Sequence, residues 1–160
     1  MTITTFDDAL CRVIEPDVCV TSRRAEVLRI LRDEGIPTVV WLCPVLPFIN
    51  DTEENLLGLL DLCFGAGVYG ILCFGFGVTL REGDREYFYQ KLDEHFPGVR
   101  QKYIKEFGNC YECISKNNER LMKIFRAECG RHGVLCDTRR IFAYLSEFED
   151  KLSGEQLSLF

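Results

Sequence analysis

The segment formed by residues 39–55 constrains the fold of this chain more than any other stretch. It begins with five consecutive apolar residues, which are typical of a strand buried on both faces. Two prolines follow, and because proline lacks a backbone N–H, the chain must leave the sheet there. Asp51 or Thr52 can then cap a helix. The polar pair of Asn50 and Asp51 is therefore expected just past the carboxyl end of a strand, where α/β folds and βα barrels place their sites.

Strand and helix patterns alternate through residues 1–80, which predicts consecutive βα units. The expected strands are residues 2–5, 36–43 and 68–76, and the expected helices are residues 6–13, 22–35 and 52–64, with Ser22 as a cap. Three such units form an open, partial barrel, because a closed βα barrel needs about 200 residues or more. We therefore expect an α/β fold whose inner strand faces are covered by a further segment or by a partner.

After residue 80 the pattern becomes helical. Helices are expected at residues 85–95, 99–107, 118–132 and 138–151, separated by segments rich in glycine. The expected organisation is a half-barrel (residues 1–80), a helical extension (residues 81–152) and a flexible tail (residues 153–160).

Composition limits the cellular setting. No run of about 18 apolar residues occurs, which argues against a membrane span. The N-terminus lacks the basic region of a signal peptide, so we expect a cytoplasmic protein. The 9 cysteines are an odd number, which favours reduced thiols over a disulfide framework. Several lie in apolar surroundings and are expected in the core: Cys11, Cys19, Cys43, Cys63 and Cys73.

Charge is distributed unevenly along the chain. The whole chain has a net charge of −6, but residues 97–140 carry 10 Lys and Arg against 5 Asp and Glu. This basic region can bind the phosphates of a nucleic acid, or it can be a solvated helical face.

Several motifs occur in a characteristic order. They are Ile3-Thr4-Thr5-Phe6-Asp7, Ile14-Glu15-Pro16, Thr21-Ser22-Arg23-Arg24, Gly35-Ile36-Pro37 and the prolyl turn 44–51, followed by segments 74–81, 85–89 and 107–113. Together they resemble the C-terminal half of a radical S-adenosylmethionine (SAM) protein of the spore photoproduct lyase-like group. That resemblance implies a complete enzyme that uses SAM and a [4Fe–4S] cluster for radical lyase chemistry of the DNA-repair kind.

The cluster motif of that family is missing from this sequence. Radical SAM enzymes hold the cluster through a Cys-x3-Cys-x2-Cys loop after their first strand, and no such motif occurs in these 160 residues. The chain is therefore expected to be a truncated product or to begin at an internal start. By itself it should be inactive, and its catalytic residues stay unidentified.

The resemblance also implies five co-substrate-binding residues: Thr2, Thr4, Glu15, Arg24 and Asn50. The planar fork of an arginine can bind the methionyl carboxylate, and an asparagine amide can hydrogen-bond an adenine edge. Purely structural roles stay open, since Glu15 and Arg24 can pair with each other and Asn50 can cap the helix.

Cysteine and histidine residues offer a further hypothesis. Cys110 and Cys113 have metal-ligand spacing, but with Cys129 and Cys136 downstream the pattern matches no zinc module well. We therefore expect no metal, with a metal-binding domain as the alternative. His95 and His132 are expected as cations at helix C-termini.

The last five residues resemble the short peptide that docks bacterial proteins on the sliding clamp. Gln156, Leu157, Leu159 and Phe160 would bind the clamp, or they would fold back on the chain's own helices. An alternative to the enzyme hypothesis is a non-catalytic interaction module that forms a homodimer, docks on a partner, or joins a missing N-terminal half.

Overall fold

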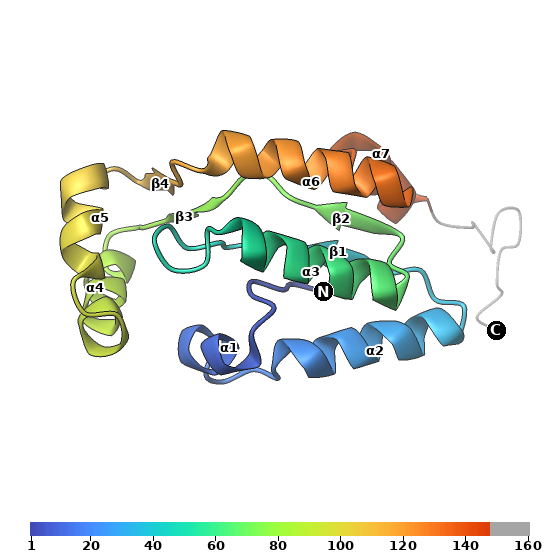
Figure 1. Cartoon of the computed structure of the whole chain (residues 1–160), viewed down its shortest axis with the longest axis horizontal. Helices are drawn as coiled ribbons and strands as arrows, with labels where there is room; N and C mark the ends of the chain where they lie inside the picture. The colour runs from blue at the N-terminus through green and yellow to red at the C-terminus, as the bar shows by residue number, and fades with distance from the viewer. Residues whose placement is uncertain (148–160) are drawn as a thin grey trace, which may run out of the picture.

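The computed structural model describes residues 1–147, which form seven helices and four short strands (Figure 1). The helices are α1 (Asp8–Ile14), α2 (Thr21–Asp33), α3 (Glu53–Ala66), α4 (Asp84–His95), α5 (Val99–Phe107), α6 (Asn118–His132) and α7 (Thr138–Ser146). The strands are β1 (Val39–Trp41), β2 (Gly70–Leu72), β3 (Gly77–Thr79) and β4 (Glu112–Ile114). None of the described helices is long and apolar enough to cross a membrane.

A small parallel sheet organises the first part of the chain. β1 and β2 pair in parallel, with Val40 opposite Ile71. Thr2 extends the sheet beside Trp41, and Leu135 extends it beside Gly70, both through parallel bridges. Four chain segments therefore lie side by side in the order in which they occur in the sequence. This is the order that consecutive βα units produce, and the fold is α/β as expected.

Three helices cover one face of this sheet. α3 packs between α2 and α6, and the three lie in front of the strands in Figure 1. Alternate strand residues point into this layer, among them Val40, Leu42 and Ile71, which are fully buried. Thr52 caps α3 by accepting a hydrogen bond of 3.1 Å from the Asn55 N–H, which confirms one of the two caps expected at the prolyl turn.

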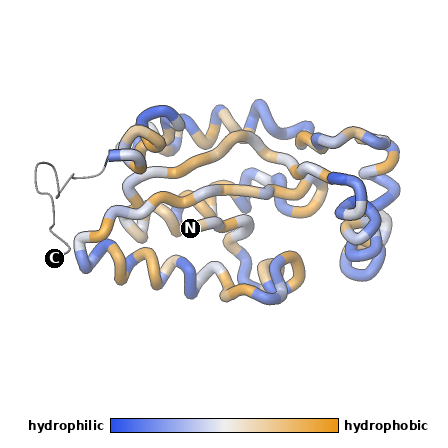
Figure 2. Tube along the Cα trace, turned by 180° about the vertical axis from the view of Figure 1, so that it is seen from behind, coloured by the Kyte–Doolittle hydropathy of each residue, from blue (hydrophilic) through white to orange (hydrophobic). Residues whose placement is uncertain are grey.

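The opposite face of the sheet is largely uncovered in the part of the chain that the structure describes. Seen from behind in Figure 2, the strands lie in front of the helices and are apolar along much of their length. The side chains of Trp41 and Phe74 are 39% and 60% exposed there, with their ring centroids 5.3 Å apart. α7 covers the β2 end, where a Cβ on Gly70 would lie only 3.1 Å from Ile141.

A second core joins the remaining elements. It includes Leu80, Leu92, Tyr103 and Cys113, contributed by α4, α5, β4 and the segment after β3. β4 pairs with β3 in an antiparallel ladder, and it lies in one of the segments that the sequence analysis placed between the helices of the extension. Gly77 permits the pairing, because a Cβ there would lie 2.6 Å from the Cys113 carbonyl oxygen.

Two local expectations need correction. Ser22 does not cap a helix: α2 begins at Thr21 without a side-chain cap, and Ser22 hydrogen-bonds the carboxylate of Asp8. Cys19 and Cys43 are exposed, because each lies in a connecting segment: Cys19 between α1 and α2, and Cys43 beyond the end of β1. The other three cysteines expected in the core are buried.

Candidate functional site

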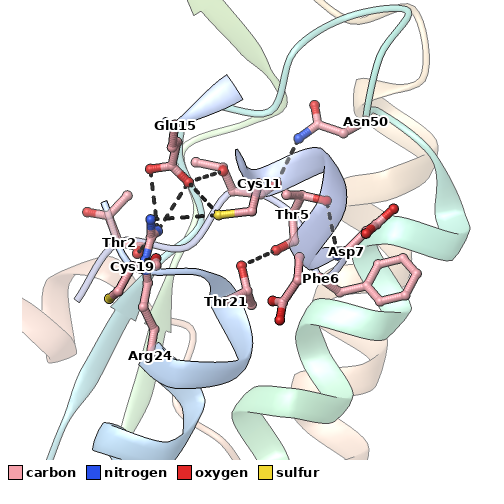
Figure 3. Close-up of polar contacts among 12 residues, drawn as sticks. Thr2, Thr5, Phe6, Asp7, Cys11, Glu15, Cys19, Thr21, Arg24 and Asn50 are labelled. Carbon is pink, nitrogen blue, oxygen red and sulfur yellow. Dashed lines mark hydrogen bonds and ion pairs between the residues drawn. The ribbon is translucent and has the colours of Figure 1, made fainter. Parts of the chain in front are cut away.

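Glu15 and Arg24 form an ion pair between the end of α1 and the first turns of α2 (Figure 3). One terminal nitrogen of Arg24 lies 3.1 and 3.3 Å from the two carboxylate oxygens of Glu15. The Arg24 side chain is only 7% exposed and that of Glu15 is 23% exposed. Burial alone would lower the pKa of the guanidinium, but the hydrogen bonds and charge of Glu15 raise it above its ordinary value.

Arg24 also holds two backbone carbonyls. Its Nε donates to the Cys19 carbonyl at 2.8 Å, and a terminal nitrogen donates to the Thr2 carbonyl at 3.0 Å. The Thr2 carbonyl belongs to the outermost segment of the parallel sheet, so Arg24 fixes that segment against α2. The Thr2 side chain itself is exposed.

Thr4 and Asn50 continue the same network toward the prolyl turn. The Thr4 hydroxyl donates to Glu15 at 2.7 Å, and its backbone carbonyl accepts a hydrogen bond of 2.8 Å from the Asn50 amide. The Asn50 carbonyl oxygen in turn accepts from the Leu46 N–H at 2.6 Å. Asn50 is 1% exposed, which places its amide inside the protein. The chain Arg24–Glu15–Thr4–Asn50 is therefore continuous.

The structure thus brings four of the five predicted site side chains together at the carboxyl end of the first sheet segment. Their polar atoms hydrogen-bond mainly to one another and to the backbone. For Glu15 and Arg24 this is the mutual pairing that the sequence analysis gave as the alternative to binding a co-substrate. Such a network can fix the position of neighbouring backbone atoms. Direct contact of these five residues with a co-substrate stays a prediction.

A second set of contacts ties the prolyl turn to the segment before α6. The carboxylate of Asp51 accepts a hydrogen bond from the Phe48 N–H at 2.8 Å and another from the Ser115 hydroxyl. The Asn117 amide donates to the Asp51 carbonyl at 3.1 Å. Phe48 adopts a left-handed φ of 65°, a conformation that these contacts help to maintain.

The sequence interpretation missed Ser115 and Asn117. The available signal was a run of polar residues (115–117) directly before an amphipathic helix, which is typical of capping segments. That signal did not indicate that the partner of Ser115 is Asp51, which lies 64 residues earlier in the chain.

A hollow of about 490 Å³ lies where β1 and β2 end. It is lined by Cys43 and Pro44 after β1, by residues 74–79 after β2, and by Glu112, Ile114 and Asn118. The Asn118 side chain accepts from the Phe76 N–H at 2.8 Å and so fixes the backbone of the lining. The hollow adjoins the Trp41–Phe74 pair on the uncovered face, and its size is within the range of ligand pockets.

The thiols do not form a metal centre in the described part of the chain. Cys110 is exposed whereas Cys113 is buried in the second core, and burial raises the pKa of the Cys113 thiol. No group of three or more His, Cys, Asp or Glu side chains among residues 1–147 could hold a metal ion. The described residues therefore do not fit a [4Fe–4S] cluster, which needs several cysteine ligands.

Part of the basic region is neutralised within the chain. Lys116, Arg120 and Arg131 pair with Glu106, Glu53 and Glu128 respectively. These pairs are typical of a solvated helical face, and nucleic-acid binding by residues 97–140 stays a prediction. The predicted clamp-binding residues, Gln156, Leu157, Leu159 and Phe160, lie outside the described residues.

His95 and His132 lie in the last turns of α4 and α6, the positions expected from the sequence. His132 also stacks on the ring of Phe64, with centroids 4.1 Å apart.

Comparison with known proteins found no matching family model, curated protein or solved structure. The resemblance of the sequence motifs and the geometry of the strand ends are therefore the basis for a functional hypothesis.

Proposed function

We propose that this chain is the C-terminal part of a radical SAM protein similar to spore photoproduct lyases. In such proteins SAM bound to a [4Fe–4S] cluster supplies a 5′-deoxyadenosyl radical that acts on a substrate. The resemblance suggests a nucleic-acid lesion as that substrate. The cluster ligands would come from a segment outside these 160 residues, so the chain alone is expected to be inactive.

One observation supports this proposal most directly: a parallel sheet in chain order has three helices on one face, while among the described residues its other face is covered only near β2, by α7. Parallel sheets occur almost only with both faces covered. In a βα barrel the helices lie outside, and the inner strand faces pack against the remaining strands of the same barrel. An apolar face that carries Trp41 and Phe74 suits this arrangement, because further barrel strands would bury it.

The polar network has a defined role in this proposal. The network would fix the position and direction of the strand ends that face the co-substrate. Its members are Arg24, Glu15, Thr4 and Asn50. The hollow after β1 and β2 would provide part of the binding space. No reaction step is assigned to a residue of this chain.

The coding sequence directly upstream of the Met1 codon provides the first test. An in-frame Cys-x3-Cys-x2-Cys motif, about 150 residues earlier on the usual barrel length, would support the proposal. The longer polypeptide, reconstituted anaerobically with iron and sulfide, should then form 5′-deoxyadenosine from SAM. A matched variant with those three cysteines replaced by alanine should form none. An upstream region without the motif would overturn the proposal.

Trp41 offers a second test, because it is the only tryptophan of the chain. In the isolated chain its indole, 39% exposed, should be quenched readily by acrylamide. In the longer polypeptide it should be shielded, with emission shifted to shorter wavelength. Equal quenching in both polypeptides would show that the upstream segment does not cover this face.

A non-catalytic interaction module is the second candidate, favoured by the same uncovered face. Here a second copy or another protein would cover Trp41 and Phe74. Analytical ultracentrifugation should then find a dimer of the isolated chain, and Phe74→Glu should convert it to a monomer. A wild-type chain that stays monomeric at high concentration would argue against self-association.

A further inference from the structure

A groove of about 360 Å³ separates α1 from α4, on a different part of the molecule from the hollow after β1 and β2. Three elements contribute apolar side chains to its lining: Val13 and Ile14 from α1, Leu46 and Ile49 from the prolyl turn, and Phe88 and Leu92 from α4. The volume is within the range of small-molecule sites, about 300 to 1,000 Å³. The groove therefore has room for the apolar body of a small molecule.

The charged residues that line this groove are both basic, Arg12 and Lys91, with His95 beside them. No Asp or Glu is among the described residues that line it. Lys91 and His95 share one carboxylate, that of Glu94, at 2.7 and 3.4 Å. All three of these side chains are more than a third exposed, so water screens that pairing.

No carboxylate oxygen among the described residues lies within ion-pair distance of Arg12, although the Asp8 carboxylate is near enough for the two charges to attract each other. Its one hydrogen bond of 3.3 Å goes to the Asp8 backbone carbonyl, while the Asp8 carboxylate accepts from Ser22. The other nearby acid, Glu15, is paired with Arg24. The Arg12 guanidinium thus keeps most of its donors for a ligand, and its planar fork matches a carboxylate.

We propose that the groove between α1 and α4 binds a small amphipathic carboxylate. Its apolar chain would lie among Ile49, Phe88 and Leu92, and its acid group would pair with Arg12 at the rim beside Lys91. A phosphodiester chain would not use the apolar lining, and a neutral hydrocarbon would leave the basic rim unpaired. This site requires neither SAM nor an iron–sulfur cluster, so a test of ligand binding in the groove is independent of the radical SAM proposal.

Calorimetric titration of the whole chain with decanoate tests this site. We expect saturable 1:1 binding of decanoate, and weaker binding of decanol, which has the same chain without the charge. Arg12→Gln should weaken decanoate binding about tenfold, as expected for the loss of one charge-assisted contact, and leave decanol binding unchanged. Arg23→Gln, which removes an exposed arginine of α2, is the matched control and should have no effect.

A second variant tests the position of the apolar chain. Val13 is 38% exposed, so Val13→Trp can fill the groove without burying a larger side chain in the core. It should abolish binding of both probes, while circular dichroism shows an intact fold. Absence of saturable decanoate binding to the wild type, or equal affinity in Val13→Trp, would overturn the proposal.

Discussion

The side-chain amide of Asn50 donates a hydrogen bond of 2.8 Å to the backbone carbonyl of Thr4, 46 residues earlier in the chain. The same side chain accepts the Leu46 N–H at 2.6 Å, so one buried amide holds both the first sheet segment and the prolyl turn. The two motifs that these residues represent are far apart in sequence. Their contact places the strand ends of the candidate site at a fixed separation.

Asn50→Ala should therefore destabilise the protein. It would leave the Leu46 N–H without its partner and remove a donor from the Thr4 carbonyl, at a cost of about 2 to 3 kcal/mol in the free energy of unfolding. Urea titration followed by circular dichroism measures this change. Asn109→Ala, at an exposed position, is the control and should change the free energy of unfolding by less than about 0.5 kcal/mol. Similar values for the two variants would show that Asn50 does not brace the turn.

Arg24→Lys should also destabilise, although it keeps the positive charge. A lysine ammonium cannot reach the Cys19 carbonyl, the Thr2 carbonyl and the Glu15 carboxylate together, as the guanidinium does. We expect a loss of about 2 to 4 kcal/mol in the free energy of unfolding, since most of this pair is buried. Chemical denaturation of Arg24→Lys and of Arg23→Lys, an exposed neighbour, distinguishes this role from a general effect of charge. Equal stability of the two variants would contradict it.

Substitution of alanine for two different glycines should have opposite effects on the stability of the protein. A Cβ at Gly77 would lie 2.6 Å from the Cys113 carbonyl oxygen, so Gly77→Ala should separate β3 from β4 and cost about 1 to 3 kcal/mol. A Cβ at Gly65, in the last turn of α3, would meet no atom within 4 Å. Gly65→Ala should therefore stabilise the protein by up to about 1 kcal/mol through helix propensity. Thermal unfolding of both variants measures these changes in stability. If Gly77→Ala left the stability unchanged, β3 and β4 would not be close-packed at this position.

Stability should fall at alkaline pH because of three buried thiols. Burial raises the pKa of Cys63 and Cys129 to about 12 and that of Cys73 to about 11. The folded protein therefore keeps these protons above the ordinary thiol pKa of about 8.5, whereas the unfolded chain releases them. The stabilisation is complete below that value and is lost as the pH rises toward the folded pKa, by about 1.4 kcal/mol per pH unit for each thiol.

Urea unfolding between neutral pH and about pH 10.5, above the pKa of an unfolded thiol, measures this slope. Cys63→Ala, although less stable at neutral pH, should show a shallower decline because one such thiol is gone. Cys19→Ala, at an exposed position, should keep the wild-type slope. If the free energy of unfolding of Cys63→Ala fell as steeply with pH as that of the wild type, the buried Cys63 thiol would not contribute to the pH dependence.

The helices were predicted well because their signals are local. The expected helices at residues 99–107 and 118–132 coincide with α5 and α6, and Thr52 caps α3 as one of two candidates. Apolar periodicity over a few turns and glycine at the helix ends carry this information within one short segment of the chain. The strands were predicted too long, because a run of apolar residues does not show where its pairing partner ends.

Sequence alone determined the alternation of strands and helices, the prolyl turn after β1, and the four residues that the buried network joins: Thr4, Glu15, Arg24 and Asn50. Only the tertiary structure decided what those residues do. Glu15 pairs with Arg24, and Arg24 also donates to two backbone carbonyls. Asp51 accepts a hydrogen bond from Ser115, 64 residues later, because folding brought these two segments together. The uncovered sheet face was likewise fixed by packing, since the burial of Trp41 depends on which elements lie above it and not on its neighbours in the chain.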